Sequence, residues 1–95
     1  MTPEQMRELD RWISGHVFNW SDIDYDVNRT PYYTLALESA MEVQMKCVEK
    51  GPISVRQLTD GKWIVSGEWS WDESSVAETL PLAICKYAKE LFSQK

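Results

Sequence analysis

Apolar side chains recur at helical spacing in three parts of the chain. The first predicted helix covers residues 3–15, and its apolar positions follow one another every three or four residues, at Met6, Leu9, Ile13 and Val17. Four polar positions are expected to face water, namely Arg7, Asp10, Arg11 and Ser14. A capping-box pattern in Thr2 and Gln5, with Pro3 at the first helical position, predicts where this helix begins.

A second helix is predicted over residues 34–50, with Thr34 as its N-cap and Gly51 and Pro52 as its stop signal. Its main apolar stripe consists of Leu37, Ala40, Met41, Gln44 and Val48, and the stripe is extended sideways by Leu35, Val43 and Cys47. So wide an apolar arc predicts that this helix packs on a sheet and also contacts another helix.

A third helix is predicted over residues 79–93. Pro81 falls in its first turn, where a missing amide hydrogen costs little. One buried face is predicted from helical spacing, at Leu80, Ile84, Tyr87, Ala88 and Leu91.

Two strands are predicted over residues 53–58 and 62–70, joined around Gly61. A two-residue turn would pair Val55 with Ser66. A three-residue loop with Gly61 in the left-handed conformation pairs Val55 with Val65 instead. We favour the second register, because it brings four large apolar side chains to one face of the hairpin, those of Ile53, Val55, Trp63 and Val65.

Residues 16–33 are predicted to be irregular, with residues 22–27 as a loop or a short edge strand. A hairpin alone is marginally stable, so either these residues or a second chain is expected to extend the sheet, and a homodimer is one of the two alternatives. The predicted order is helix, irregular segment or short strand, helix, strand, strand, helix. The fold class is therefore α+β.

Several segments together resemble the phage ABA sandwich domain family of small bacteriophage and prophage proteins. They are the first helix with its Trp-containing end (residues 7–13 and 17–20), the Pro-Tyr-Tyr-Thr run before the second helix (31–34), the second helix (36–43) and the C-terminal helix (77–92). The resemblance implies a small α/β/α sandwich with the hairpin packed between helices. It also implies a phage setting, and it supplies no reaction.

Composition and charge narrow the function classes. The chain has 95 residues, 43% of them hydrophobic, which is enough for one small domain. No apolar run approaches the roughly 20 residues that cross a bilayer, and no signal-peptide pattern is present, so a soluble cytoplasmic protein without membrane contact is expected. A net charge of −5 and a pI near 4.8 oppose direct binding to nucleic acid.

The two cysteines, Cys47 and Cys85, both fall inside predicted helices. We expect them to be buried hydrophobic side chains, since neither has metal-type spacing to a partner. A nucleophilic thiol would need a base, and the single histidine, His16, lies far from both in the sequence. The cysteines therefore predict no catalysis.

The aspartate series Asp22, Asp24 and Asp26 has the spacing at which a calcium loop begins. Such a loop also needs Gly at its sixth position and a carboxylate at its twelfth, where this chain has Val27 and Tyr33. The glycines are scattered, so no phosphate-binding loop is predicted either. We therefore expect no enzyme, no metal site and no cofactor.

Protein binding is the function that this sequence favours. The candidate partner-binding residues are acidic apart from one tryptophan, and they are Asp22, Asp24, Asp26, Glu68, Trp71, Asp72 and Glu73. A carboxylate-rich phage protein can occupy a basic, nucleic-acid-binding groove on a host complex, as anti-CRISPR proteins do, which predicts inhibition of a host defence system.

Two other functions stay open at this point. The protein could be a phage accessory or structural-assembly protein whose partner is another phage protein. It could also bind a small nucleotide signal, and the aromatic and basic residues that would suit such a ligand are Trp20, Arg29, Tyr32 and Tyr33.

Overall fold

A computed structural model of the 95-residue chain describes residues 2–19, 30–67 and 76–93. The described elements are helices α1 (Pro3–His16), α2 (Leu37–Val48) and α3 (Leu80–Ser93) and strands β1 (Ile53–Gln57), β2 (Trp63–Gly67) and β3 (Val76–Ala77). The predicted α+β class is confirmed. The possible strand at 22–27 lies outside the described residues.

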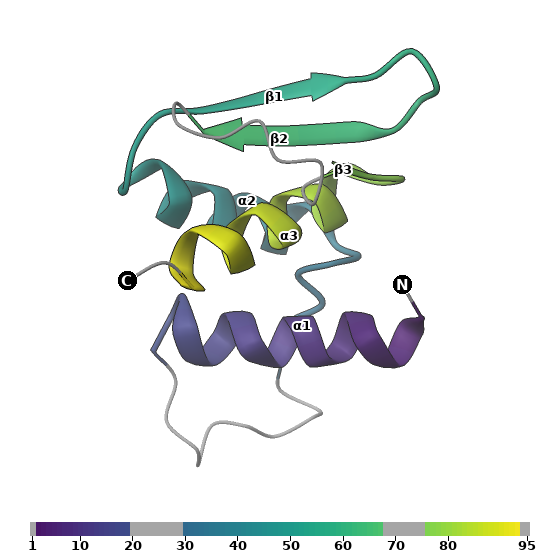
Figure 1. Cartoon of the computed structure of the whole chain (residues 1–95). Helices are drawn as coiled ribbons and strands as arrows, with labels where there is room; N and C mark the ends of the chain where they lie inside the picture. The colour runs from purple at the N-terminus through teal and green to yellow at the C-terminus, as the bar shows by residue number, and fades with distance from the viewer. Residues whose placement is uncertain (1, 20–29, 68–75, 94–95) are drawn as a thin grey trace.

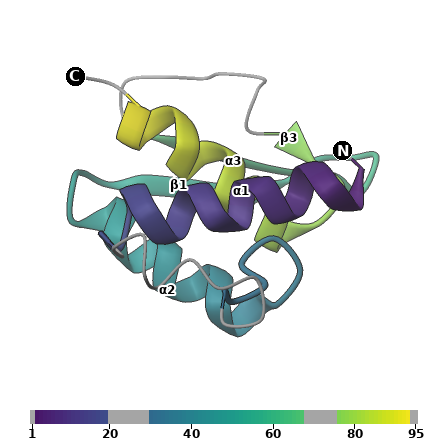
Figure 2. The same cartoon turned by 90° about the horizontal axis from the view of Figure 1, so that it is seen from below.

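Three layers build the molecule, with the sheet as one outer layer, α2 and α3 in the middle and α1 as the other outer layer (Figure 1). The central element is α3, which contacts β2 and β3 on one side and α1 and α2 on the others. Seen from below, α1 crosses under the helix pair (Figure 2). Within the described part of the chain, all three helices therefore lie on the same side of the sheet. The expected hairpin between helices is not found there, because α3 is apolar enough around its circumference to separate the sheet from α1.

The hairpin has the register that the sequence favours. Val55 lies opposite Val65, and Gln57 lies opposite Trp63. The loop is closed by a bond of 2.7 Å from the Leu58 amide to the Lys62 carbonyl, and Gly61 has a φ of +90°. The three-residue loop with a left-handed glycine is thus confirmed.

A third strand, β3, was not predicted from the sequence. It pairs antiparallel with β2, so that Ala77 lies opposite Trp63 and Val76 opposite Ile64. Two residues are too few to show a strand period. Because β3 occupies one edge of β2, the order of strands is β1-β2-β3 and β1 is an edge strand.

The start of α1 agrees with its sequence signals, whereas the start of α2 does not. The Thr2 and Gln5 side chains accept from each other's backbone amides at 2.9 and 3.2 Å, which confirms the capping box. Thr34, the predicted N-cap of α2, lies in a preceding turn, and the N-cap is Ala36. The reason is tertiary: the Thr34 amide donates to the buried Asp10 carboxylate at 2.9 Å.

Asp10 and Ser14 were expected to face water, and this prediction is wrong, because both are fully buried. The Asp10 carboxylate also accepts from the Arg7 guanidinium at 2.8 Å. Arg7 in turn donates to the carbonyls of Thr30 and Pro31 at 3.1 and 3.3 Å. A buried ion pair on α1 thus fixes the turn that leads into α2.

The core is centred on α3. The predicted buried face is confirmed for Ile84, Tyr87 and Ala88, while Leu80 and Leu91 are partly buried against the core. Tyr87 approaches the sheet so closely that a Cβ atom on Gly67 would lie 2.2 Å from its hydroxyl oxygen. Gly67 is therefore needed at this crossing point between β2 and α3.

Candidate protein-binding surface

Helix α2 buries one apolar face and exposes a second one. Its core face consists of Ala40, Val43 and Cys47, each with an exposed fraction of 0%. Four further apolar side chains on the same helix are exposed by 43 to 70%, those of Leu37, Met41, Met45 and Val48. At about 100° per residue, the centres of the two faces are roughly 125° apart. The stripe predicted for this helix is therefore wrong at Leu37, Met41 and Val48, which do not reach the core.

The small residues explain how α2 packs. Its main described neighbour is α3, which itself buries Ala83, Cys85 and Ala88. Small side chains let two helices approach closely, and alanine and cysteine are buried on both helices, whereas the leucine and methionines of α2 are exposed. The larger apolar residues of α2 are then left on the outside.

Exposed large apolar side chains are confined to one stretch of the described chain. All of them lie between residues 32 and 55, and in the described parts of α1, β2, β3 and α3 there is none. Single exposed apolar residues are ordinary on protein surfaces, but a contiguous group marks an interaction site. We call the group on and just before α2 the α2 patch, and it consists of Leu35, Leu37, Met41, Met45 and Val48.

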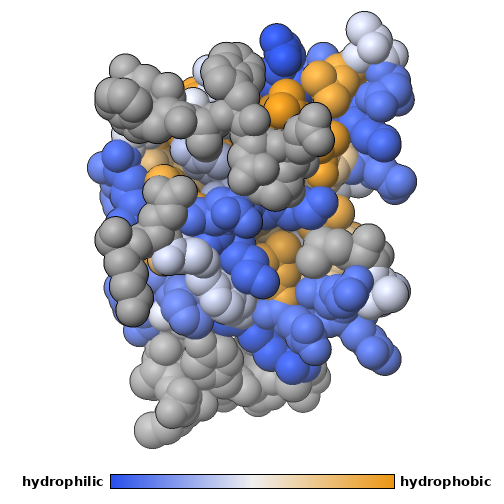
Figure 3. All heavy atoms as spheres, in the orientation of Figure 1, coloured by the Kyte–Doolittle hydropathy of each residue, from blue (hydrophilic) through white to orange (hydrophobic). Residues whose placement is uncertain are grey.

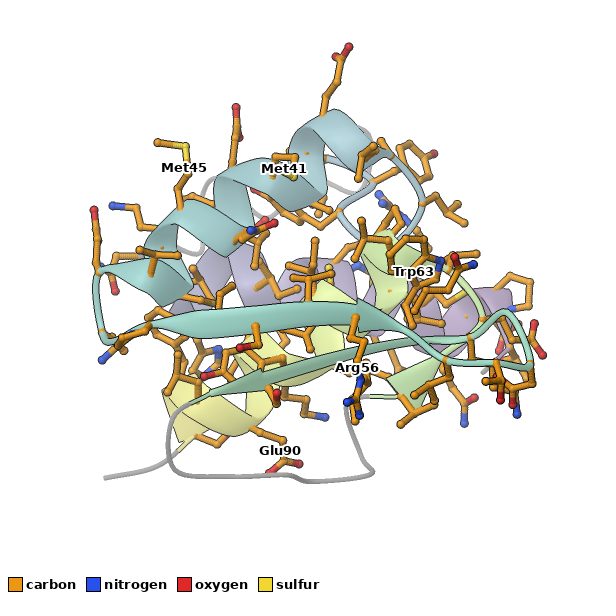
Figure 4. The ribbon with its side chains drawn as sticks, turned by 90° about the horizontal axis from the view of Figure 1, so that it is seen from above. Met41, Met45, Arg56, Trp63 and Glu90 are labelled. Atoms are coloured by element: carbon orange, nitrogen blue, oxygen red, sulfur yellow. The ribbon has the colours of Figure 1, made fainter. Side chains whose placement is uncertain are left out.

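The part of the α2 patch that lies on the helix itself faces away from the sheet and from the other helices (Figure 4). Figure 4 shows Met41 and Met45 on this helix, with the Met45 side chain extending away from the sheet. Met45 is the most exposed of the set at 70%, followed by Leu35 at 61%. The nearby Tyr32 ring is also exposed, but the Arg7 guanidinium lies 4.0 Å from its centre, so this ring is engaged within the domain.

One flank of the α2 patch carries only negative charge. Glu38, Glu42 and Glu49 are all exposed, and they project roughly 60–100° from the centre of the patch on the same side. Gln44 borders the other side. Lys46 lies further round the helix, where its ammonium is 3.8 Å from the Glu49 carboxylate in an exposed pair.

A pocket of about 450 Å³ adjoins the N-terminal end of the patch, because Leu35 contributes to both. Its walls combine apolar side chains such as Met6 and Leu82 with the cations Lys62 and Lys86. The Lys86 ammonium donates to the Val76 carbonyl at 3.0 Å. Figure 3 shows the face on which α3 lies in front of α2 (Figure 1), and on this face apolar atoms are framed by hydrophilic side chains.

The candidate binding residues chosen from the sequence lie outside the described residues. This holds for the whole set, namely Asp22, Asp24, Asp26, Glu68, Trp71, Asp72 and Glu73. Trp20 and Arg29 of the nucleotide-site hypothesis also lie outside, while Tyr33 is buried in the core with 2% of its surface exposed. The grouping of these residues stays a prediction.

Both cysteines are buried, as predicted, and their environment suppresses thiolate formation. Burial raises the pKa of the Cys47 thiol to about 12. Burial also raises the pKa of Cys85, with smaller contributions from Asp10 and Cys47. His16 is exposed and stacks on Trp12, with 4.2 Å between the ring centres. None of these three side chains is arranged for nucleophilic chemistry.

No protein-family model, no curated protein and no solved structure matches this chain. Among the helices that the structure describes, none combines the length and the apolar character needed to span a membrane. The α2 patch must therefore be interpreted from its own chemistry. The sequence does contain a sign of this patch, because α2 has more apolar residues than one buried helix face can accommodate.

Proposed function

We propose that this domain works by binding another protein through the α2 patch, without catalysing a reaction. The observation that carries the proposal is the packing of α2, which leaves four apolar side chains exposed to water while Ala40, Val43 and Cys47 form its core face. Taking a fully exposed large apolar side chain out of water is worth about 1.5–3 kcal/mol. These four side chains are 43 to 70% exposed, so a partner that covers the patch gains roughly half of that free energy for each of them.

The composition of the patch suits a protein partner. Met41 and Met45 have flexible, polarisable side chains, which adapt to the shape of a partner surface. The 12 residues of α2 span about 18 Å, so the helix presents anchors over three turns. Helices bound in grooves are recognised through anchors at this spacing.

We propose the host cytoplasm during phage infection as the setting, and inhibition of a host defence system as the role. The resemblance to small phage proteins and the net charge of −5 support this. An acidic protein is attracted to a basic, nucleic-acid-binding groove and competes there with phosphate. A phage accessory or assembly protein would use the same patch on a phage partner.

The pocket beside Leu35 supports small-molecule binding as a second candidate. Its volume of about 450 Å³ is within the range of ligand sites, and its lining combines apolar side chains with two lysines and Glu78. A thermal-shift screen with nucleotide signals tests this candidate. A stabilisation by such a ligand that Lys62→Ala and Lys86→Ala remove would favour it over protein binding.

The protein-binding proposal is tested by affinity capture from infected-cell lysate with three immobilised baits. They are the wild type, the Met41→Ser/Met45→Ser variant, and a control with Lys89→Ser/Glu90→Ser on the exposed side of α3. The wild type and the control are expected to retain the same protein, and the methionine variant is expected to lose it with an unchanged circular dichroism spectrum. Equal recovery by all three baits would contradict the proposal.

A further inference from the structure

The charge beside the α2 patch restricts what can cover it. Glu38, Glu42 and Glu49 form one flank over about 16 Å, and every one of these side chains is exposed. Lys46 pairs with Glu49 at 3.8 Å, and three glutamates against this one lysine still leave a net charge of −2. A partner on the patch comes close to these carboxylates along its whole length.

A second copy of this chain does not complement that flank. If two α2 helices pack antiparallel about a two-fold axis, each flank meets the same flank of the partner, and Glu38 approaches the partner's Glu49. If they pack parallel, the glutamate flank meets the flank of Gln44, which carries no charge. Neither arrangement supplies a cation, and the antiparallel one adds like-charge repulsion.

We infer that the α2 patch receives an amphipathic helix of another protein, whose apolar face is bordered by lysine or arginine. Such a helix places its apolar side chains on Leu37, Met41, Met45 and Val48 and its cations beside the three glutamates. Apolar contact supplies the affinity, and the charged flank selects the partner and its orientation. This inference rests on the proposed function and adds the chemical class of the partner.

The test uses two synthetic helical peptides of about 18 residues with identical leucine faces, one flanked by lysine and one by glutamate. Binding to the full chain is measured by fluorescence anisotropy at low and high ionic strength. The lysine-flanked peptide is expected to bind at least about tenfold more tightly, and the difference is expected to shrink as salt screens the flank.

Two matched variants separate the flank from the overall charge of the protein. Glu38→Lys/Glu42→Lys is expected to reverse the preference between the peptides. Glu8→Lys/Glu90→Lys changes the net charge by the same amount at exposed positions on α1 and α3, and it is expected to keep the preference for the lysine-flanked peptide. Reversal by both variants would overturn the inference, because the attraction would then be non-specific.

The Met41→Ser/Met45→Ser variant shows whether a failure concerns the class of the partner or the binding surface itself. If the variant binds both peptides equally more weakly while the wild type shows no preference between them, the inferred partner class is wrong and the patch is still a binding surface. If the variant binds both peptides as tightly as the wild type does, the patch itself is not a binding surface. Light scattering of the wild type and the methionine variant completes the test. If the wild type is a dimer and the variant is a monomer, a second copy of this chain occupies the patch, and the inference is overturned.

Discussion

Helices α2 and α3 lie side by side and have nearly the same length, 12 and 14 residues, but they use their apolar residues differently. The exposed positions of α3 include Lys89 and Glu90, and its large apolar residues Ile84 and Tyr87 are buried. On α2, the residues with the same apolar character, such as Met45 and Leu37, are in water. The large apolar side chains of α3 are buried within this domain, while part of the apolar surface of α2 is exposed and can contact another molecule.

The difference follows from the number of neighbours. The sheet, α1 and α2 all pack on α3, whereas α2 packs chiefly on α3 alone. A helix with one main neighbour can bury one face only. Apolar side chains beyond that face then indicate a second interface rather than a larger core.

The largest effect is expected where the chain approaches α2. Asp10→Ala removes the acceptor of the Thr34 amide and the partner of Arg7. Breaking a buried pair from one side is strongly destabilising, so we expect a loss of about 3 kcal/mol in the free energy of unfolding, measured by urea denaturation. Glu8→Ala, at an exposed position on the same helix, is the control and should change stability by less than about 0.5 kcal/mol. Equal losses in the two variants would show that α2 does not depend on this buried contact.

An effect of similar size is expected from a direct comparison of the two helices. Ile84→Ala on α3 removes a fully buried side chain and is expected to cost about 2–5 kcal/mol. Met45→Ala on α2 removes a side chain that is 70% exposed and is expected to change stability by less than about 0.5 kcal/mol. Thermal and urea unfolding of both variants measure the contrast, and a cost above 2 kcal/mol for Met45→Ala would mean that the α2 patch is part of the core.

A smaller effect is expected where α3 meets the sheet. In Gly67→Ala the new methyl group would lie 2.2 Å from the Tyr87 hydroxyl oxygen, so one of the two must move, at a cost of about 1–3 kcal/mol. Tyr87→Phe removes the clashing oxygen. In a double-mutant cycle, Gly67→Ala should therefore cost less in the Tyr87→Phe background than in the wild type. Additive costs would place the two residues further apart than the structure does.

Local sequence signals predicted the parts of the fold that depend on local chemistry. The capping box of Thr2 and Gln5 and the left-handed Gly61 in its three-residue loop are set by neighbours within a few residues, and both are confirmed. Asp10 and Thr34 were misplaced because their bond joins residues 24 positions apart. The periodicity of apolar residues within a helix does not reveal a contact between residues so far apart in the sequence.

The α2 patch was missed for a related reason. Spacing shows that α2 has a wide apolar arc, but the side that meets α3 depends on how closely the two backbones approach. Because Ala40 and Cys47 permit the closest approach, they become the core face and Met41 does not. The acidic residues chosen from the sequence, among them Asp24 and Asp72, lie outside the described residues and stay candidates.

The buried thiols, one on each helix, give a smaller and pH-dependent effect. The Cys47 pKa rises from 9.0 to about 12 on folding, and the pKa of Cys85 is also raised. The unfolded chain therefore loses these protons at a lower pH than the folded chain, so stability is full below about pH 9 and falls above it. We expect each thiol to lower the free energy of unfolding by about 1 kcal/mol between pH 9 and 10, because the unfolded thiol is only partly ionised over this range. The Cys47→Ala/Cys85→Ala variant should lose stability less steeply over this range in urea titrations. Parallel curves would mean that the thiols ionise alike in both states.

The smallest change in stability is expected from oxidation, which also gives the sharpest contrast between exposed and buried sulfur. Dilute hydrogen peroxide at pH 7.5 should convert Met41 and Met45 to sulfoxides, because both thioethers are in water. Cys47 and Cys85 should react only when the chain unfolds, since they are inaccessible and almost wholly protonated. Mass spectrometry of peptides follows each site, and the melting temperature should stay within the scatter of repeated scans. Sulfoxides are polar, so the same treatment should weaken binding of the lysine-flanked peptide. Retained peptide affinity after full oxidation of both methionines would show that the apolar face of α2 is not the contact surface.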